Sequence, residues 1–452
     1  MKKFYIQTYG CQMNQADSER LAEVVGRLDY VQTDQIETAD LLLLNTCSVR
    51  DKAEQKVYSV LGSWKTFKEQ RAGLIIGVGG CVAQQEGEKL LKRVRHVDLV
   101  FGTHNIHKLP QMIEQVQALQ SRLVETAFYR DPVFMEDVEG RPHIQGAKAY
   151  VPIMQGCNKV CSFCVVPHVR GREVSRSSAN IVREIEDLVR RGVKEVMLLG
   201  QNVNSYGKHS PDEVSFPELL SLVNDAKGLE RIRFTTSHPQ DLSPELIDAF
   251  ATLEHLCEQL HLPVQSGSDS VLHRMRRGYT LREYSDRIGR LSQRCPEVSL
   301  STDIIVGFPG ESDAEFECTL ELLRKVKYDE IFSFMYSPRP QTVSAKLYAD
   351  DISDEVKRER LQRVQALQKE ISLTKNRQKI GAIEEILVEG RSRLHNGQIM
   401  GRTRNNRIVN VVGPESLVGA LVPVRVVGAT ANSLLGELLT AASDSQLEGD
   451  LA

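Results

Sequence analysis

Short apolar runs alternate with amphipathic stretches along the first quarter of the chain. The apolar runs have the length of buried β-strands and cover residues 4–8, 41–45, 74–78 and 98–101. Apolar residues at helical spacing lie between them, for example over residues 18–28. Strands that alternate with helices form a parallel sheet. The pattern therefore predicts a parallel α/β domain over residues 1–125.

A second α/β series begins after residues 126–146, a stretch with Pro, Gly and little periodicity that is typical of a linker. Strand-like runs follow at residues 150–154, 195–199, 231–235, 259–263, 299–306 and 331–336, with helical stretches between them. Six strand–helix units predict a partial (β/α)6 barrel over residues 147–375, which ends in a charged helix from Ser353 to about Ile371. Such a fold places its chemistry at the carboxyl ends of the strands.

The last part of the chain changes character. Five short strand-like runs, at residues 383–388, 398–400, 407–412, 421–427 and 433–438, are separated by turn signals such as Asn396-Gly397 and Gly413-Pro414. Short strands at this spacing predict a small β-barrel over residues 376–440. The acidic tail, residues 441–452, is predicted to be disordered. The predicted fold class is therefore α/β, with a parallel α/β domain, a partial (β/α)6 barrel and a small C-terminal β-barrel.

Three cysteines, Cys157, Cys161 and Cys164, form a C-x3-C-x2-C motif directly after the first strand of the predicted partial barrel. Three thiolates in one loop can bind three irons of a cluster and leave the fourth iron open to a substrate or cofactor. A zinc site is the alternative, but it would need a fourth ligand, and the nearest candidate is His168. A disulfide is a weaker interpretation still, because three cysteines leave one thiol over.

Three further cysteines, Cys11, Cys47 and Cys81, each follow a strand of the first predicted domain. Because the carboxyl ends of parallel strands lie at one edge of a sheet, the three thiols should converge there. This arrangement predicts a second three-cysteine cluster site. The alternative is three unrelated buried thiols, since free cysteine is often buried. The remaining cysteines lack such an arrangement and are interpreted as core or surface thiols: Cys257, Cys295 and Cys318.

Polar side chains follow several strands of the predicted partial barrel, and polar groups on one rim of a barrel usually line a ligand site. Gln201 and Asn202 follow the second strand, and Gln265 follows the fourth. Phe163, next to Cys164, offers a ring that can lie against the base of a cofactor. Loops are polar in general and loop aromatics often only pack, so each of these four candidates for cofactor binding is weak by itself.

The composition is that of an ordinary globular protein, with 41% hydrophobic and 26% charged residues. The longest apolar run, over residues 74–83, is too short to cross a membrane. No signal-peptide core follows Met1. We therefore expect a cytoplasmic protein with free thiols and no membrane partner.

The net charge of −3 argues against a chain that binds polyanions over its whole surface. Positive charge is concentrated between residues 377 and 407, with seven Lys or Arg against three acids. A small β-barrel with a basic face commonly binds RNA through its phosphates. The alternative is a solubilising surface on a lid domain. The predicted RNA contacts are Arg391, Arg393, Arg402, Arg404 and Arg407.

Together these motifs resemble the methylthiotransferase family of radical S-adenosylmethionine (SAM) enzymes over nearly the whole chain. The likeness is greatest to the branch that modifies N6-dimethylallyladenosine in tRNA, and no ligand position departs from its pattern. The C-terminal barrel resembles a TRAM RNA-binding domain. The residues that carry the resemblance are Tyr9-Gly10-Cys11-Gln12-Met13-Asn14, Asn45-Thr46-Cys47, Gly79-Gly80-Cys81, Cys164-Val165-Val166-Pro167 with Arg170-Gly171, and Gly200-Gln201-Asn202-Val203-Asn204.

The resemblance implies two [4Fe-4S] clusters and two molecules of S-adenosyl-L-methionine per product. One cluster would chelate SAM and cleave it to a radical, and an auxiliary cluster would carry the sulfur. The product would be 2-methylthio-N6-dimethylallyladenosine next to the anticodon. The expected partners are the anticodon stem-loop of tRNA and an electron donor such as a flavodoxin or ferredoxin. The implied ligands are Cys157, Cys161 and Cys164 for the first cluster and Cys11, Cys47 and Cys81 for the second.

Two other functions stay open. A sister methylthiotransferase would act on threonylcarbamoyl-adenosine in tRNA or on an aspartate of a ribosomal protein, although those branches have different residues after the first Gly-Cys pair. A non-catalytic iron–sulfur protein that binds RNA would instead have metal sites saturated by protein ligands.

Overall fold

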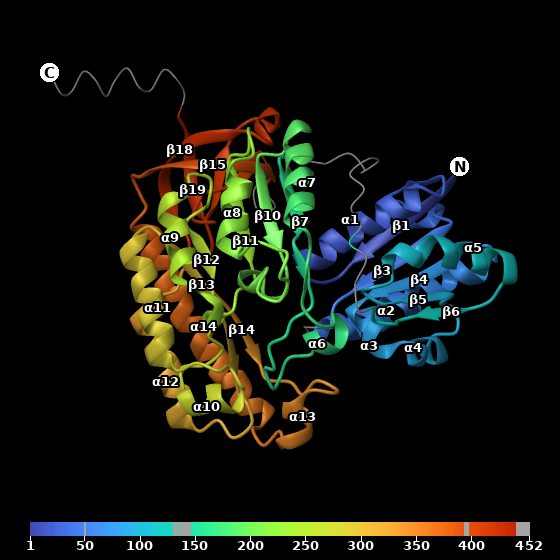
Figure 1. The fold of residues 1–452 in the computed structure, drawn as a ribbon, viewed down its shortest axis with the longest axis horizontal. Coiled ribbons are helices and arrows are strands. Elements are labelled where there is room, and N and C mark those ends of the chain that lie inside the picture. Colours follow the sequence, from blue (N-terminus) through green and yellow to red (C-terminus); the bar gives the residue numbers. More distant parts are fainter. Residues whose placement is uncertain (49–50, 130–133, 135–145, 393–396, 440–452) are drawn as a thin grey trace.

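The computed structural model describes residues 1–48, 51–129, 134, 146–392 and 397–439. Figure 1 shows a parallel α/β domain beside a partial barrel, with a closed barrel at one end of the latter. The predicted tail, most of the predicted linker and the predicted turn residue Asn396 lie outside the described residues. No helix in the described part of the chain is long and apolar enough to cross a membrane. The predicted fold class is confirmed.

The first sheet has the order β2-β1-β3-β4-β5-β6, with all strands parallel. The strands are β1 (Lys2–Thr8), β2 (Tyr30–Gln32), β3 (Leu41–Thr46), β4 (Ile75–Gly80), β5 (Leu99–Phe101) and β6 (Leu123–Glu125). The helices that cover them include α1 (Gln12–Gly26), α2 (Asp51–Gln70), α4 (Glu88–Arg93) and α5 (Leu109–Leu119).

The central strand β3 shows why the strands of this sheet are continuous apolar runs in the sequence, without alternating polar residues. Leu41 and Leu43 pack with residues of α1 and α5 on one face. Leu42 and Leu44 pack with residues of α2 and α4 on the other face. All four leucines are buried, because helices cover both sides of the parallel sheet.

The partial barrel consists of six parallel strands divided between two sheets. The order is β11-β10-β7 in one sheet and β12-β13-β14 in the other, and a single bridge from Ile232 to Leu256 leads from β11 to the segment before β12. The strands are β7 (Lys148–Pro152), β10 (Glu195–Leu199), β11 (Arg231–Thr235), β12 (Gln259–His261), β13 (Ser299–Val306) and β14 (Glu330–Met335).

Helices cover the outer face of the partial barrel, and its largest apolar core lies between them and the strands (Figure 1). On β13, Leu300 and Ile304 belong to this core. Because strand residues alternate between faces, Ser301, Asp303 and Ile305 lie on the inner face. The helices include α7 (Ser178–Arg190), α8 (Phe216–Asn224), α9 (Pro244–Thr252), α11 (Leu281–Arg294), α12 (Asp313–Val326) and α14 (Asp354–Arg377).

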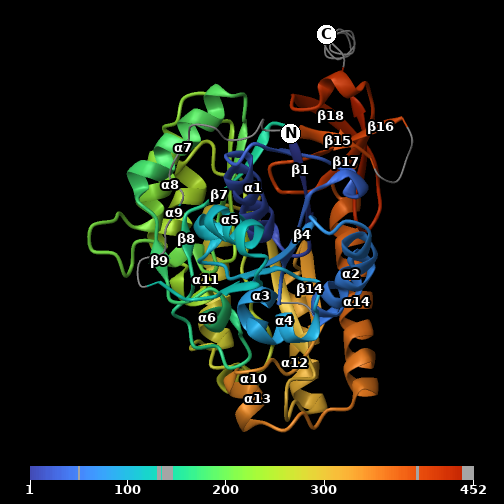
Figure 2. The ribbon, with the colours of Figure 1, turned by 90° about the vertical axis from the view of Figure 1, so that its right-hand side faces the viewer.

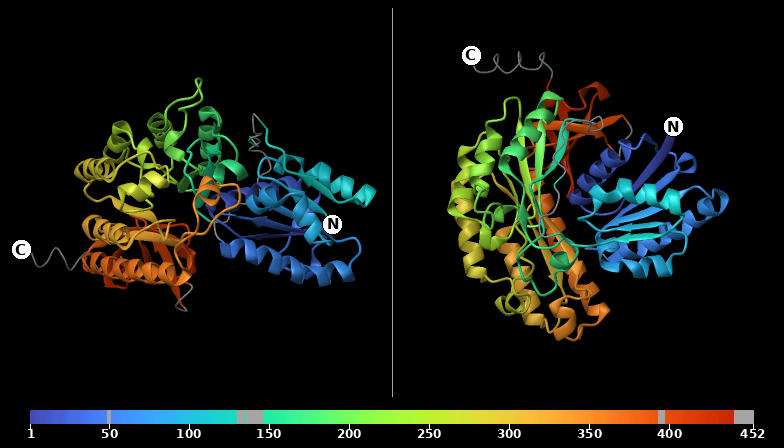
Figure 3. Two further views of the ribbon diagram at one scale, coloured as in Figure 1. Left: turned by 90° about the horizontal axis from the view of Figure 1, so that it is seen from below. Right: turned by 45° about the vertical axis from the view of Figure 1, so that its right-hand side comes forward.

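The parallel α/β domain packs against the partial barrel through α1. Figures 2 and 3 show this domain against the side of the partial barrel near β7. Met13 and Ala16 on α1 form an apolar cluster with Met197 and Leu199 of β10, joined by the ring of Tyr150 on β7. Met197 and Leu199 alternate with core residues of their strand, so α1 covers part of the inner face.

The C-terminal strands close into a barrel in the order β15-β16-β17-β19-β18. This barrel lies at the amino ends of the strands of the partial barrel. Arg231, the first residue of β11, donates to the carbonyl oxygens of Glu385 (3.0 Å) and Arg402 (2.8 Å). The strands are β15 (Ile383–Arg391), β16 (Gln398–Arg402), β17 (Ile408–Val412), β18 (Leu421–Ala429) and β19 (Leu434–Leu438).

Arg233, also on β11, allows a test of how much the contact between the C-terminal barrel and the partial barrel contributes to stability. Its side chain is 0% exposed and pairs with Glu195 (Nε to Oε2, 3.0 Å). It also donates to the carbonyl oxygens of Thr403 (2.7 Å) and Arg404 (2.8 Å). We expect Arg233→Ala to lower the free energy of unfolding by about 3–5 kcal/mol, because the Glu195 carboxylate would stay buried without its nearest cation. Chemical denaturation measures this loss.

Arg294→Ala is the matched control in the same domain. Its ion pair with Asp248 is surface-exposed, with side chains 51% and 60% exposed, so the loss should stay below about 1 kcal/mol. Equal losses of unfolding free energy in the two variants would contradict the idea that the buried ion pair of Arg233 stabilises the protein more than an exposed pair does.

Candidate functional site

The loop with Cys157, Cys161 and Cys164 lies at the carboxyl end of the partial barrel, after β7. Two short strands, β8 (Met154–Gln155) and β9 (Val174–Ser175), pair on either side of it. Gly156 begins the loop with φ +80°, and a Cβ there would lie 1.9 Å from the carbonyl oxygen of Arg172. Only glycine fits this close approach of two backbone segments.

Hydrogen bonds from other strand ends fix this loop. Gln201, predicted as a cofactor-binding residue, accepts from the N–H of Gly156 (2.5 Å). Ser162 donates its N–H to the carbonyl oxygen of Met275 (2.9 Å) and its hydroxyl to that of Arg274 (2.8 Å). Both carbonyl groups lie at the end of α10 (Asp269–Arg274), so the position of that helix determines the position of the loop.

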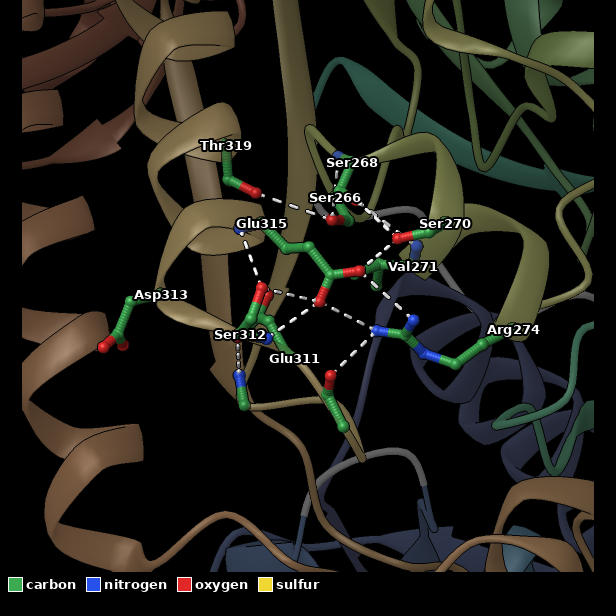
Figure 4. Close-up of polar contacts among 12 residues, drawn as sticks. Ser266, Ser268, Ser270, Val271, Arg274, Glu311, Ser312, Asp313, Glu315 and Thr319 are labelled. Atoms are coloured by element: carbon green, nitrogen blue, oxygen red, sulfur yellow. Dashed lines mark hydrogen bonds and ion pairs between the residues drawn. The ribbon is translucent and has the colours of Figure 1, made fainter.

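Polar contacts hold α10 against α12, as Figure 4 shows. Arg274 pairs with Glu315 of α12 (Nη2 to Oε2, 3.2 Å) and donates to the carbonyl oxygen of Gly310 (3.2 Å). Burial alone would raise the pKa of Glu315, but hydrogen bonds from Arg274 and Ser270 lower it to about 2. The carboxylate is therefore charged at neutral pH, and the pair stabilises the helix that supports the cysteine loop.

A buried guanidinium lies against the thiol of Cys161. Arg277 is 5% exposed and donates from Nη1 to Cys161 Sγ (3.2 Å). Burial raises the pKa of Cys157 to about 11 and that of Cys164 to about 12. Such thiols give up their protons on binding a metal, and a neighbouring cation then offsets part of the negative charge. No sequence pattern indicates Arg277, because 116 residues separate it from Cys161.

Cys11, Cys47 and Cys81 converge at the carboxyl ends of three adjacent strands, β1, β3 and β4. Cys11 caps α1, Cys47 follows β3, and Cys81 begins α3 (Cys81–Glu86). A hydrogen bond with Cys47 lowers the pKa of Cys11 to about 6. Gly80 has φ +89°, and a Cβ there would lie 2.3 Å from the carbonyl oxygen of Thr46. The backbone beside the thiols is thus too close-packed for a side chain.

The two cysteine sets lie next to each other across the domain interface. The helix α6 (Val166–Val169), which follows Cys164, packs against α3, which begins with Cys81 (Figure 1). The Cys81 side chain is buried with Val165 and Val169 in one apolar cluster. The packing of α6 on α3 therefore brings the first set of thiols close to the second.

Two of the predicted rim residues present buried oxygen atoms that have no hydrogen-bond partner among the described residues. They are Asn202 Oδ1 and Gln265 Oε1, in residues that are 2% and 7% exposed. Nε2 of His238, which follows β11, also has no hydrogen-bond partner among the described residues. Burial lowers the pKa of this imidazole well below its ordinary range. Buried polar atoms without a partner at the strand ends are suited to a polar ligand.

The inner face of the partial barrel carries further candidate residues, which no sequence motif indicates. His261 Nε2 lies 3.5 Å from Asp303 Oδ1, and the His261 ring meets that of Phe332 edge-on at 5.6 Å. Phe332 is 39% exposed. Ile305 and the predicted cofactor residue Phe163 pack against one apolar cluster near the cysteine loop. Inner-face residues alternate with core residues, so their spacing does not distinguish them from an ordinary strand.

The predicted RNA-binding residues Arg404 and Arg407 lie in the interface with the partial barrel. Arg404 pairs with Glu258 (Nη2 to Oε1, 2.8 Å), and Arg407 pairs with Asp329 (Nη2 to Oδ1, 2.5 Å). Both acids lie at the amino end of the partial barrel, next to β12 and β14. The placement differs from the open phosphate-binding surface that the sequence suggested, because partly buried carboxylates bind these two guanidinium groups.

The other predicted RNA contacts have different surroundings. Arg402 pairs with Glu389 within the C-terminal barrel (3.3 Å). Arg391 is 77% exposed and pairs with Glu415 at the surface. Arg393 lies outside the described residues. Of the arginines that the structure describes in this set, Arg391 is the one most open to a phosphate.

Comparison with known proteins adds three family matches and a set of close relatives. The matching family models are Uncharacterized protein family UPF0004 (residues 3–102), the Radical SAM superfamily (residues 151–323) and the TRAM domain (residues 377–439). A relative from Syntrophotalea carbinolica, named tRNA-2-methylthio-N(6)-dimethylallyladenosine synthase, is 51% identical over 97% of this chain and 100% of its own. A relative of the same name from Idiomarina loihiensis is 46% identical over 100% and 94%. The chain belongs to this synthase family.

Solved structures share the fold of this synthase family at low identity. Radical S-adenosylmethionine methyltransferase TsrM from Kitasatospora setae is 14% identical with a TM-score of 0.56, and the match covers 76% of this chain and 74% of that one. Cobalamin-dependent S-adenosylmethionine radical enzyme OxsB is 13% identical with a TM-score of 0.52, over 82% and 56%. At such identities the likeness concerns the fold alone.

The Radical SAM superfamily match implies SAM and a [4Fe-4S] cluster, and this chain has donor atoms of the kinds that both groups need. The three thiols of the C-x3-C-x2-C loop are free, which is the donor set that such a cluster needs. Arg277 supplies a cation at one of them. The unpartnered oxygens of Asn202 and Gln265 can accept from the amino group of a bound cofactor.

Arg407→Ala should loosen the contact between the C-terminal barrel and the partial barrel. The Arg407 and Asp329 side chains are 13% and 7% exposed, so we expect a loss of about 1.5–3 kcal/mol of stability. Lys375 also binds Asp329 (2.7 Å), which keeps the loss moderate. Hydrogen exchange should rise in β16 and β17, whereas Arg391→Ala, at an exposed position, should leave it unchanged. Equal exchange in both variants would contradict the docking role of Arg407.

Proposed function

We propose that this chain converts N6-dimethylallyladenosine in tRNA to its 2-methylthio derivative, as the names of its relatives state for those proteins. The observation that carries the proposal is the pair of three-cysteine sets that lie next to each other at one domain interface. Addition of sulfur and methyl to an unactivated ring carbon needs a radical source and a sulfur source in close proximity. The two sets meet this requirement.

We infer that Cys157, Cys161 and Cys164 hold the SAM-binding cluster and that Cys11, Cys47 and Cys81 hold an auxiliary [4Fe-4S] cluster. The chemistry that these groups supply is reductive cleavage of one SAM to a 5′-deoxyadenosyl radical and transfer of a methyl group from a second SAM to sulfur. The placement of three thiols in one loop and of three more at adjacent strand ends supports the assignment, as do the tight glycine positions Gly156 and Gly80.

The protein's own residues hold and shield the site. Ser162 and Gln201 fix the position of the cysteine loop through hydrogen bonds. Met13 and Ala16 of α1 cover part of the inner face of the partial barrel and exclude water from it. A closed and dry site protects a reactive group from side reactions.

The prenylated adenine has a suitable place on the inner face, between the cysteine loop and the C-terminal barrel. The ring of Phe332 is 39% exposed there, beside His261 and Asp303. An exposed aromatic ring can stack on a base or contact the prenyl group, and the Asp303 carboxylate can accept from the N6–H of the base. Burial of the five prenyl carbons contributes about 2–4 kcal/mol at about 0.8 kcal/mol per carbon.

We further propose that the tRNA contacts the C-terminal barrel, where the TRAM family match lies and Arg391 is exposed. A flavodoxin or ferredoxin is the proposed class of electron donor, because SAM cleavage needs one electron. The cytoplasmic location and the domain limits at residues 125, 146, 375 and 440 stay predictions. A sister methylthiotransferase is disfavoured by the names of the relatives, and a non-catalytic iron–sulfur protein by the Radical SAM match.

Replacing Cys157, Cys161 and Cys164 by Ala should abolish SAM cleavage. Anaerobically reconstituted protein should bind about eight irons per chain, and this variant should keep about half of them. Iron assay and chromatography of 5′-deoxyadenosine measure the two quantities. Retention of SAM cleavage by the variant would disprove the assignment of the first cluster.

The complementary variant, with Cys11, Cys47 and Cys81 replaced by Ala, serves as the matched control. We expect 5′-deoxyadenosine to form without methylthio product, because the radical source belongs to the other domain. Mass spectrometry of tRNA nucleosides detects the product. Full product formation would mean that these three thiols are only structural.

Wild-type enzyme should methylthiolate tRNA without the prenyl group about 30- to 1,000-fold more slowly than prenylated tRNA, which corresponds to about 2–4 kcal/mol. Phe332→Ala should reduce this preference, because it removes apolar surface from the inner face. Leu119→Ala, at an exposed apolar position on α5, should leave the preference intact. Equal turnover of both tRNAs by the wild type would refute the substrate but not the radical chemistry.

A further inference from the structure

In the part of the chain that the structure describes, each cysteine set has a buried guanidinium group near its thiols, but the two arginines, Arg277 and Arg170, both come from the partial barrel. Arg277 contacts Cys161 from within the same domain. Arg170 follows Val169, which packs against Cys81 of the parallel α/β domain, and its positive charge opposes the rise that burial causes in the pKa of the Cys81 thiol. Arg170 directly follows α6, the helix after Cys164. One short segment therefore links the first cysteine set to a ligand residue of the second.

Arg170 is buried at the interface and is held by the opposite domain. It is 3% exposed, and its Nη2 donates to Asp17 Oδ2 on α1 (2.6 Å). Asp17 is itself 4% exposed. The positive charge of Arg170 also acts on Cys11, which caps the same helix. The guanidinium thus binds one carboxylate of the other domain, and its charge acts on two thiols of that domain.

The backbone of the same segment is fixed as well. The carbonyl oxygen of Val169 accepts from Thr103 Oγ1 (2.8 Å), and that of Arg170 lies 2.9 Å from His104 Nε2. A Cβ on Gly171, where φ is +80°, would lie 3.1 Å from the same His104 nitrogen. These contacts fix the point from which the Arg170 side chain extends, so the guanidinium has little freedom to leave the thiols.

We propose that Arg170 is a positioning residue which the partial barrel supplies to the auxiliary cysteine site, where it sets the local charge and the reduction potential of the cluster. The inference rests on the proposed function, which assigns a [4Fe-4S] cluster to Cys11, Cys47 and Cys81. Hydrogen bonds to ligand sulfur and nearby net charge both tune such a cluster. Asp17 has the opposite charge, so substitution of the two residues should act in opposite directions.

The test uses the full chain with Cys157, Cys161 and Cys164 replaced by Ala, so that only the auxiliary cluster remains. Arg170→Gln should shift its midpoint potential to a more negative value, because Asp17 would be left without its cation. Asp17→Asn should shift the potential to a more positive value. Arg170→Lys keeps the charge and should stay nearest to the parent. Redox titration followed by electron paramagnetic resonance measures all three variants.

Two controls separate this effect from a general disturbance. Arg172 is exposed and lies two residues further along the same segment, so Arg172→Gln should leave the potential unchanged. In the converse background, with Cys11, Cys47 and Cys81 replaced by Ala, Arg170→Gln should shift the remaining cluster far less.

Opposite shifts for Arg170→Gln and Asp17→Asn support the proposal, as does loss of iron from Arg170→Gln that Arg170→Lys restores. Equal potentials in all variants overturn it, and so does an equal shift in Arg172→Gln. A background protein that binds no iron overturns both this inference and the auxiliary cluster of the proposed function. About four irons per chain with unmoved potentials refute the role of Arg170 alone.

Discussion

The ion pair between Arg170 and Asp17 joins the two domains at the place where both cysteine sets lie. Burial of either charge without the other would cost several kcal/mol, so the pair disfavours every docking position that separates them. Apolar contacts such as those of Met13 with Met197 bury surface between the domains, but the hydrophobic effect has no preferred direction and does not fix one orientation. The relative position of the two cysteine sets therefore depends on a directional contact between charges.

Directional contacts of buried charges also fix the C-terminal barrel, which lies at the amino ends of the strands of the partial barrel. The buried guanidinium groups of Arg231 and Arg233 donate hydrogen bonds to its backbone carbonyl oxygens. In the opposite direction, Arg404 of this barrel forms an ion pair with Glu258 of the partial barrel. A barrel fixed in this way lies about one strand length, roughly 17–20 Å, from the cysteine loop. An RNA that contacts both must extend along the partial barrel, which is consistent with a stem-loop as substrate.

Most elements could be predicted because their signals are local. Buried parallel strands are continuous apolar runs bounded by turns, and β10, β11 and β13 have the predicted limits. The edge strands β2 and β6 were missed, since three residues are too few for a pattern. The predicted run at residues 259–263 ends earlier in the structure, at His261. Within the C-terminal barrel, all five strands were predicted to within a few residues.

The cysteine sites and the basic arginines show where local information ends. Cys11, Cys47 and Cys81 could be grouped in advance, because parallel topology brings the ends of adjacent strands to one edge. The sequence gives no sign that Arg170 and Arg277 lie near Cys81 and Cys161, since each arginine is distant in the chain from that cysteine. Arg404 and Arg407 looked like phosphate ligands, but Glu258 and Asp329 bind them once the domains pack. Spacing along a chain reports on strands and loops, whereas the partner of a buried charge is specified only by the packing of one domain on another.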